Sequence, residues 1–257
     1  MHSPTDRQTR ILELIKHQGF VSIGALAQRL GDTTEDIQTD IDLLCEQGLL
    51  QRHESDTGPL SSTENIAYTT RQTLYAEEKA HIGREVARHI PDHSSLFINI
   101  GTTTEAVAKA LLGHKGLRVV TNDLNVASIL SPNPELEVIV AGGIVRSRDQ
   151  GIVGEATIDL IRQFRLDYGI IGISAIDASG ALLDFDYREV RVAQAIIENS
   201  RQVFLIADHS KFNRNAMVRL GHISQLSALF TDAEPPAAMA EQLAAAKVTL
   251  HIAKATA

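Results

Sequence analysis

The sequence predicts an α/β protein in which an N-terminal winged helix-turn-helix module precedes a doubly wound α/β domain. Two observations support this prediction. The first sixty residues carry three short helical patterns followed by a strand-like run. From residue 95 onward, apolar runs of strand length alternate with helical patterns, which is typical of a largely parallel sheet. We therefore expect a head over residues 1–58, a linker over 59–75 and a body over 76–257.

Composition favours a globular protein without a membrane segment. The 257 residues are 44% hydrophobic, and no window of about 18 residues is uninterrupted by polar side chains. The N-terminus lacks an apolar signal core, so we expect a cytoplasmic protein with no membrane partner. The single cysteine, Cys45, excludes an internal disulfide bond. Because the ten histidines form no metal-binding pattern, we expect no metal and no cofactor.

The head is predicted to hold three helices and a wing. The helices are expected over residues 7–19, 23–30 and 35–47, and residues 49–53 form the first wing strand. Ser22 is placed to cap the second helix, and Thr33 or Thr34 the third. The third helix then occupies the recognition position of a winged helix-turn-helix. An alternative is a three-helix module that contacts only proteins.

A DNA contact set follows from that placement. Polar side chains at the helix starts, on the recognition helix and on the wing would face the duplex. The candidates are Ser22, Thr33, Thr34, Gln38, Thr39 and Arg52. The net charge of the head argues against this interpretation, because residues 1–60 hold five basic and ten acidic side chains. DNA-binding modules are normally basic where they meet phosphate.

The body alternates strands with helices. Strands are expected over 95–100, 118–121, 137–140, 168–173, 203–207, 228–231 and 248–252, and helices over 76–90, 104–112, 123–130, 156–164 and 188–199. Ligands of such sheets bind at the carboxyl ends of the strands. Five polar or glycine-rich loops follow predicted strands, at 101–104, 121–123, 142–143, 172–174 and 208–211. They should therefore converge on one edge.

This edge has the residue types of a phosphate site. A strand that ends at a glycine, three threonines and a helix start offers free N–H groups and hydroxyl donors. Lys211 would add a positive charge, and carboxylates could accept from substrate hydroxyls. The candidate effector residues are Gly101, Thr102, Thr103, Thr104, Thr121, Asn122, Gly142, Gly143, Asp184, Asp186, Glu189 and Lys211. Arg146 and Arg148 fall in a polar loop that is either solvated or able to close on the ligand.

Several longer motifs resemble the DeoR type of transcriptional regulator. They lie at residues 96–106, 121–127, 141–143, 151–156, 172–177, 183–191, 195–200 and 208–217. The resemblance implies a repressor with a sensor body related to sugar-phosphate isomerases, released from operator DNA by a small phosphorylated metabolite. For the most similar members that effector would be glycerol 3-phosphate. Regulators with helix-turn-helix heads usually bind repeated half-sites as symmetric oligomers, so we expect a homodimer or homotetramer.

The recognition helix departs from the family pattern. Family members typically read Thr-Ile-Arg-Arg-Asp-Leu where this chain reads Asp-Ile-Gln-Thr-Asp-Ile at residues 36–41. Gln38 and Thr39 thus replace two arginines, which removes part of the counterion-release contribution to DNA affinity. We hypothesise weakened DNA binding, a need for oligomers or an altered operator.

Two other function classes remain open at this stage. One is a sensor that acts through mixed oligomers with a competent paralogue, which the residues at 38 and 39 would favour. The other is a sugar-phosphate isomerase in which Glu189, Asp184 and Lys211 act as acid and base. An isomerase, however, has no use for the head.

Overall fold

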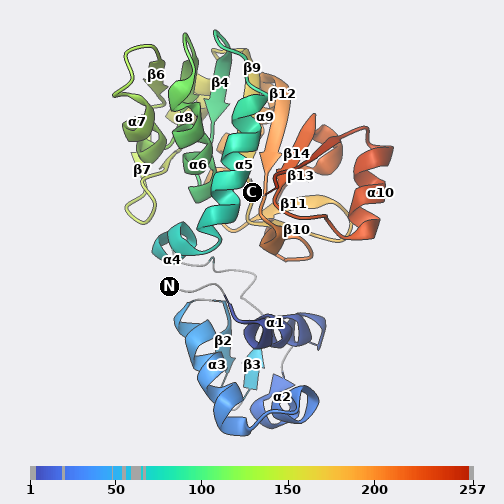
Figure 1. The fold of residues 1–257 in the computed structure, drawn as a ribbon. Coiled ribbons are helices and arrows are strands. Elements are labelled where there is room, and N and C mark those ends of the chain that lie inside the picture. The colour runs from blue at the N-terminus through green and yellow to red at the C-terminus, as the bar shows by residue number, and fades with distance from the viewer. Residues whose placement is uncertain are drawn as a thin grey trace. The chain divides into compact units, whose positions relative to one another are not determined.

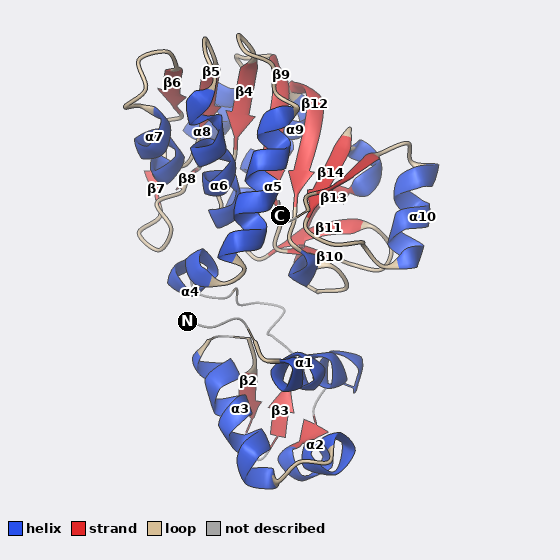
Figure 2. Cartoon of the chain, viewed as in Figure 1, coloured by secondary structure: helices blue, strands red, loops and turns tan. Residues whose placement is uncertain are grey.

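The computed structural model describes residues 4–18, 21–47, 49–53, 56–58, 65 and 68–254 (Figure 1). The chain forms two compact units, Met1–Leu74 and Tyr75–Ala257, and each is described by itself. Figure 2 distinguishes the mainly helical first unit from the mixed second unit. Among the described helices, none has the length and apolar character that crossing a membrane requires.

The first unit is a winged helix-turn-helix, as predicted. Its three strands form one antiparallel sheet in the order β1-β3-β2, with the wing made by β2 and β3. The elements are α1 (Asp6–Gln18), β1 (Val21–Ser22), α2 (Ile23–Leu30), α3 (Thr34–Glu46), β2 (Gln51–His53), β3 (Asp56–Gly58) and α4 (Tyr68–Thr73).

Apolar side chains from all three main helices form the core of this unit. The buried members are Ile11, Ile15, Leu26, Ala27, Ile37, Ile41, Leu44, Leu49 and Leu50. The spacing of these positions along α1 and α3 places them on one face of each helix, so packing fixes which face of α3 remains outside.

A buried polar contact fixes α3 against α1. Asp40 is buried on α3, pairs with the Arg7 guanidinium and accepts from Gln8 Nε2 at 2.9 Å. Because a buried carboxylate without partners is costly, this contact stabilises one orientation of α3. Asp40 therefore has a structural role that is separate from the candidate DNA contacts.

One element falls where a linker is predicted. The helix α4 occupies part of the stretch 59–75. Its six residues carry three threonines and no apolar periodicity, so the sequence gives no helical signal there. The segment predicted as a linker therefore includes one short helix.

The second unit is built on a parallel sheet of seven strands. The order is β15-β14-β12-β9-β4-β5-β6, and every neighbouring pair is parallel. The strands are β4 (Ser95–Ile98), β5 (Arg118–Thr121), β6 (Glu137–Val140), β9 (Leu166–Gly172), β12 (Ser200–Ile206), β14 (Ala228–Thr231) and β15 (Thr249–Ile252). The chain reverses its direction of travel across the sheet between β4 and β9, which makes this pair the topological switch point.

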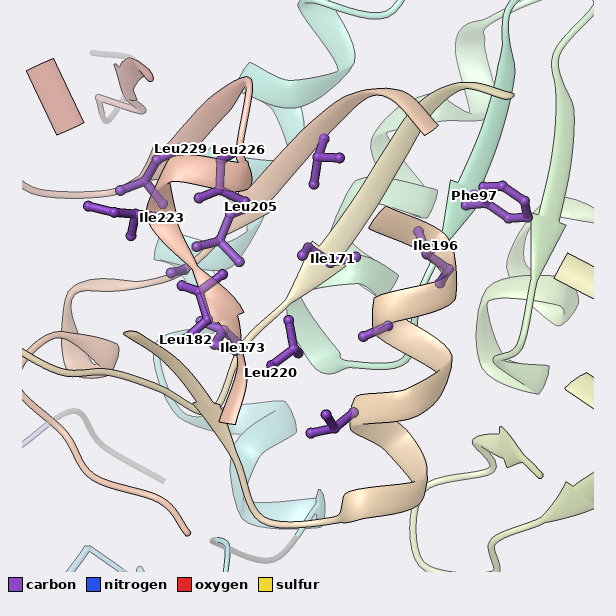
Figure 3. Close-up of a cluster of buried hydrophobic side chains, with 14 of the residues drawn as sticks. Phe97, Ile171, Ile173, Leu182, Ile196, Leu205, Leu220, Ile223, Leu226 and Leu229 are labelled. Atoms are coloured by element: carbon purple, nitrogen blue, oxygen red, sulfur yellow. The ribbon is translucent and has the colours of Figure 1, made fainter. Parts of the chain in front are cut away.

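Helices cover both faces of this sheet, as a doubly wound fold requires. One buried cluster joins α5, α6 and α7 to the sheet. A second cluster, part of which is drawn in Figure 3, joins α8, α9 and α10 to the opposite face. Neighbouring residues Phe97 and Ile98 of β4 belong to different clusters, because alternate side chains leave a strand on opposite faces. The helices are α5 (Ala76–Arg88), α6 (Thr102–Ala110), α7 (Leu124–Leu130), α8 (Glu155–Ile161), α9 (Tyr187–Glu198) and α10 (Ala237–Ala245).

Short antiparallel elements supplement the main sheet and were not anticipated from the sequence. One sheet has the order β10-β11-β13, and a separate pair joins β7 to β8. Their bounds are β7 (Ile144–Val145), β8 (Ile152–Val153), β10 (Ala175–Ile176), β11 (Ala181–Asp184) and β13 (Val218–His222). Runs of two to five residues do not carry a clear period, which is why they read as loops. Three single-turn 3-10 helices complete the unit: η1 (Leu111–Gly113), η2 (His209–Lys211) and η3 (Ile223–Gln225).

Candidate functional site

The start of α6 lies at the carboxyl end of β4, beside the switch point. Gly101 is its N-cap residue and has a φ of 149°, a conformation that favours glycine. The helix begins at Thr102, two residues earlier than predicted. This shift puts the three threonines in the first helical turn, where backbone N–H groups lack helical partners.

The three threonines are not equivalent. Thr102 and Thr103 are buried but retain a little exposure, whereas Thr104 is completely enclosed. The Thr104 hydroxyl donates to the Gly101 carbonyl at 2.6 Å. Its hydroxyl proton therefore closes the turn, while Thr102 and Thr103 lie at the more accessible part of the loop.

A buried carboxylate interacts with the same turn. The Gly101 N–H donates to Asp123 Oδ2 at 3.3 Å, and Asp123 also caps α7 by accepting from Asn125 N at 2.8 Å. Burial, together with the nearby Glu105 carboxylate, raises the pKa of Asp123 to about 7. Asp123 is thus a carboxyl group that can change charge near neutral pH, in contact with the candidate phosphate loop.

The carboxyl edge of the sheet also holds buried polar atoms without hydrogen-bond partners among the described residues. They are Asn99 Oδ1, Asn122 Oδ1, Asp208 Oδ2 and Thr231 Oγ1. Each belongs to the last residue of a strand or follows a strand end closely, on β4, β5, β12 and β14. Unsatisfied buried groups are costly, and their concentration along one edge is typical of a site that receives a polar ligand.

Thr121 and Asn122 shape this edge from β5. The Thr121 hydroxyl donates to the Ile98 carbonyl at 2.7 Å, which ties β5 to β4. Asn122 is 1% exposed, and its Nδ2 donates to the Ile152 carbonyl at 3.0 Å. The amide nitrogen is therefore occupied by the chain, and the amide oxygen is the atom left for a ligand.

The two glycines after β6 differ in how closely they are packed. Gly143 has a φ of 151°, and an added Cβ would lie 2.3 Å from Thr157 Oγ1. The Gly142 carbonyl accepts from that hydroxyl at 2.8 Å. This close approach to α8 accounts for Gly143 without a ligand contact, whereas an added Cβ at Gly142 would meet no atom within 4 Å.

Arg146 is buried in a cluster of carboxylates. Its guanidinium donates through Nε and Nη2 to Asp149, at 3.1 and 2.7 Å, and through Nη1 to Asp186 Oδ2 at 3.0 Å. Glu189 Oε2 lies 2.8 Å from the same Nη1. The alternative in which Arg146 is solvated is wrong, because its side chain is only 5% exposed.

The three predicted carboxylates of the 184–189 segment are held in place by the chain. Asp186 caps α9 and pairs with Arg146, Arg148 and Arg188. Burial acts to raise the pKa of Asp186, but hydrogen bonds from Arg188 and Arg146 outweigh it and keep the pKa well below its ordinary value. Asp184 is buried and accepts from Ser174 Oγ at 3.1 Å. These contacts give all three residues a structural use.

A second charged cluster surrounds Lys211 at the carboxyl end of β12. Lys211 Nζ lies 3.9 Å from Asp208 Oδ2, and Asp208 is completely buried. Burial opposes its charge, but Lys211 and the Ser210 hydroxyl lower the pKa of Asp208, with Lys79 of α5 adding to the effect. The cluster thus holds a negative charge and at least two ammonium groups within a largely enclosed volume.

The Lys211 cluster extends to the first residue of the second unit. His209 pairs with Asp232, with 2.6 Å between Nδ1 and Oδ2, and this hydrogen bond raises the pKa of His209. Tyr75 packs edge-on against the His209 ring at 4.6 Å between centroids. Burial and the charge of Asp208 raise the pKa of Tyr75 to about 12. Tyr75 therefore links the predicted ligand loop at residues 208–211 to the start of α5.

The outer face of α3 carries the candidate DNA contacts in the head. Thr34, Glu35, Asp36 and Thr39 are exposed, while Gln38 is half-buried. Gln38 Nε2 donates to Asp42 Oδ2 at 3.1 Å. Acidic side chains therefore surround the polar groups that would read the duplex.

The remaining DNA-contact candidates of the head differ in their hydrogen bonds and in how much of them the structure describes. Thr33 caps α3 by accepting from Asp36 N at 3.1 Å, and its hydroxyl donates to the Asp36 carboxylate at 2.6 Å. The Thr39 hydroxyl donates to the Glu35 carbonyl at 2.9 Å. Ser22 and Arg52 are placed by their backbones in β1 and β2, but their side chains lie outside the described part of the chain.

Two family models match the chain and together span both units. The DeoR-like helix-turn-helix domain matches residues 7–55, and the DeoR C terminal sensor domain matches residues 75–233. The ribose 5 phosphate isomerase A from Neisseria gonorrhoeae is one of the solved structures that resemble this chain. It has a TM-score of 0.40 and 16% identity, over 55% of each chain.

Curated relatives cover almost the whole sequence. The glycerol-3-phosphate regulon repressor of Escherichia coli (strain K12) is 50% identical over 248 residues, 96% of this chain and 98% of that protein. The repressor of the same name from Haemophilus influenzae is also 50% identical, over 89% of each chain. The HTH-type transcriptional repressor CsqR of Escherichia coli is 43% identical, over 92% of this chain and 91% of that protein. The chain belongs to the DeoR family of helix-turn-helix transcriptional regulators.

Proposed function

We propose that this protein represses transcription from operator DNA and leaves the operator when its sensor unit binds a small phosphorylated polyol, namely glycerol 3-phosphate. The identity of the effector rests on the names of the relatives that match both units at 50% identity. A homodimer or homotetramer would present two or more heads to repeated half-sites.

The carboxyl edge of the parallel sheet carries the effector part of this proposal. It combines the first turn of α6 with four buried polar atoms that have no hydrogen-bond partner within the described residues. Backbone N–H groups at a helix start suit a phosphate, and amide or carboxylate oxygens suit the hydroxyls of a polyol. One edge thus offers donors for one end of the ligand and acceptors for the other.

The contact between Gly101 and Asp123 suggests how binding changes the loop. The Asp123 carboxyl accepts the Gly101 N–H. A phosphate that accepts this N–H must either displace the Asp123 carboxylate or bind while that carboxyl is protonated. Two negative charges in one buried place would otherwise repel each other. Effector binding would therefore alter the turn that joins β4 to α6.

The isomerase alternative has no support from the geometry of its proposed base. Glu189 is held by Arg146 at 2.8 Å, and a carboxylate that forms an ion pair is a poor proton acceptor. The mixed-oligomer alternative keeps one specific observation in its favour, the acidic outer face of α3.

Selection of genomic DNA fragments by the purified full-length chain would test the proposed function. We expect defined fragments to be enriched at low salt and released by glycerol 3-phosphate but not by glycerol or inorganic phosphate at the same concentration. Enrichment that none of the three compounds changes would contradict the effector assignment. An absence of enrichment at any salt concentration would contradict the repressor and favour the mixed oligomer.

The double variant Gln38→Arg/Thr39→Arg is expected to bind its selected fragment more tightly than the native chain. Two added phosphate contacts should steepen the dependence of log affinity on log salt by about 1.8. Fluorescence anisotropy between 50 and 200 mM salt measures both quantities. The matched variant Gln38→Glu should weaken binding, and equal affinities for all three chains would show that α3 does not approach DNA.

Lys211→Gln is expected to weaken effector binding by about 10- to 100-fold, because one charge-assisted contact to phosphate is lost. Lys211→Arg keeps the charge and should bind more tightly than Lys211→Gln. The concentration of glycerol 3-phosphate that releases half of the bound DNA reports the effect. Equal release concentrations for native chain and Lys211→Gln would remove Lys211 from the site.

A further inference from the structure

Three potential metal ligands meet on the sensor unit. Glu85 lies in the last turn of α5 and His89 is the C-cap residue of that helix, whereas His251 lies on β15 at the other end of the unit's sequence. One ligand atom from each lies within 4.8 Å of the other two. None of the three belongs to the loops at the carboxyl edge that form the candidate effector site.

The hydrogen bonding of His89 prepares one of its ring nitrogens for a metal. His89 Nδ1 lies 2.9 Å from the Glu85 carbonyl oxygen. Because a carbonyl only accepts, Nδ1 carries the proton and Nε2 keeps its lone pair. Metal-binding histidines are commonly oriented in this way, by a backbone carbonyl on the nitrogen that does not face the metal.

His251 is held beside His89 by contacts between aromatic rings. Its ring stacks on Phe230 with 4.5 Å between centroids, and the His89 ring lies 4.2 Å from it. Each ring can offer one nitrogen to an ion, so the two histidines supply two potential nitrogen donors beside the Glu85 carboxylate.

We propose that Glu85, His89 and His251 bind one divalent transition-metal ion of the Zn²⁺ type. Two imidazoles and one carboxylate form a donor set that Zn²⁺ accepts, with a fourth position left for water. Mg²⁺ and Ca²⁺ prefer sites made of oxygen ligands, and this group has only one carboxylate. The ion would join α5, the first long helix of the sensor unit, to β15, an edge strand of its main sheet.

One existing contact competes with the ion. Arg88 Nη1 lies 2.8 Å from Glu85 Oε2, but the Arg88 side chain is 62% exposed. Exposed ion pairs of this kind contribute little to stability, so a divalent ion can replace the arginine at small cost. Loss of the pair should leave Arg88 solvated.

Isothermal titration of the full-length, tag-free chain with Zn²⁺ tests the proposal. We expect one saturable equivalent, and affinity at least about tenfold lower in His251→Phe and in Glu85→Gln, since even lost support of a ligand costs that much. His251→Phe keeps a ring that can stack on Phe230, and Glu85→Gln keeps the size of the side chain. Zn²⁺ should also raise the melting temperature of the native chain more than that of either variant.

His81→Ala is the matched control, because His81 lies on α5 but outside the ligand group. Its Zn²⁺ affinity should equal that of the native chain. The proposal is overturned if Zn²⁺ shows no saturable binding, or if both ligand variants bind it as tightly as the control. Far-UV circular dichroism establishes that each variant is folded before titration.

Discussion

Arg146→Met is expected to destabilise the sensor unit by about 3–5 kcal/mol, the loss seen when one partner leaves a buried ion pair. Methionine replaces the unbranched stem of arginine but cannot neutralise Asp149, Asp186 and Glu189, which all contact the guanidinium. Because the chain contains no tryptophan, urea unfolding followed by far-UV circular dichroism is the suitable measurement.

Arg148→Met is the matched control for that experiment. Arg148 also pairs with Asp186, at 3.0 Å, but its side chain is 59% exposed. Loss of an exposed ion pair should change stability by less than about 1 kcal/mol. If both variants unfolded at the same urea concentration, the buried cluster would not stabilise the unit.

The main architecture of the chain follows from local patterns. Strands such as β5 and β14 appear in the sequence as short apolar runs with the same bounds as in the structure. The head was predicted because Ile37, Ile41 and Leu44 recur at helical spacing and all enter its core. Patterns of this kind are readable because burial imposes the period of the element on its apolar residues.

The charged network could not be predicted in the same way. A polar loop in the sequence looks the same whether its arginine meets water or a carboxylate forty positions away, as Arg146 and Asp186 do. The convergence of Glu85, His89 and His251 has the same origin, because β15 approaches α5 only in the folded unit. Asn99 was missed as a candidate because it lies inside a stretch assigned to a strand, whereas β4 ends at Ile98.

Polar residues at strand ends were the informative signal for the candidate effector site. Thr102, Asn122 and Lys211 all follow parallel strands, and the order of the sheet brings the ends of those strands to one edge. Which atoms are used by the chain itself, such as the Thr104 hydroxyl, depends on hydrogen bonds that the sequence does not encode locally.

Asp123→Asn is expected to change how the stability of the sensor unit depends on pH. The pKa of Asp123 is about 7 in the folded chain, against an ordinary value of 3.8. Between these two values the folded state holds a proton that the unfolded state has released, so rising pH favours unfolding. Asparagine stays neutral throughout and can still cap α7, because its side-chain oxygen can accept from Asn125 N.

The difference in unfolding free energy between Asp123→Asn and the native chain should therefore shift in favour of the variant by up to about 4 kcal/mol from pH 4 to pH 8. Urea unfolding of both chains at several pH values gives this difference, and titrations of other groups cancel because the two chains share them. A constant difference across this range would show that Asp123 ionises at its ordinary pKa. Over the same pH range the affinity of the native chain for the effector should fall relative to that of Asp123→Asn. The reason is that a phosphate beside Asp123 is repelled once that carboxyl is charged.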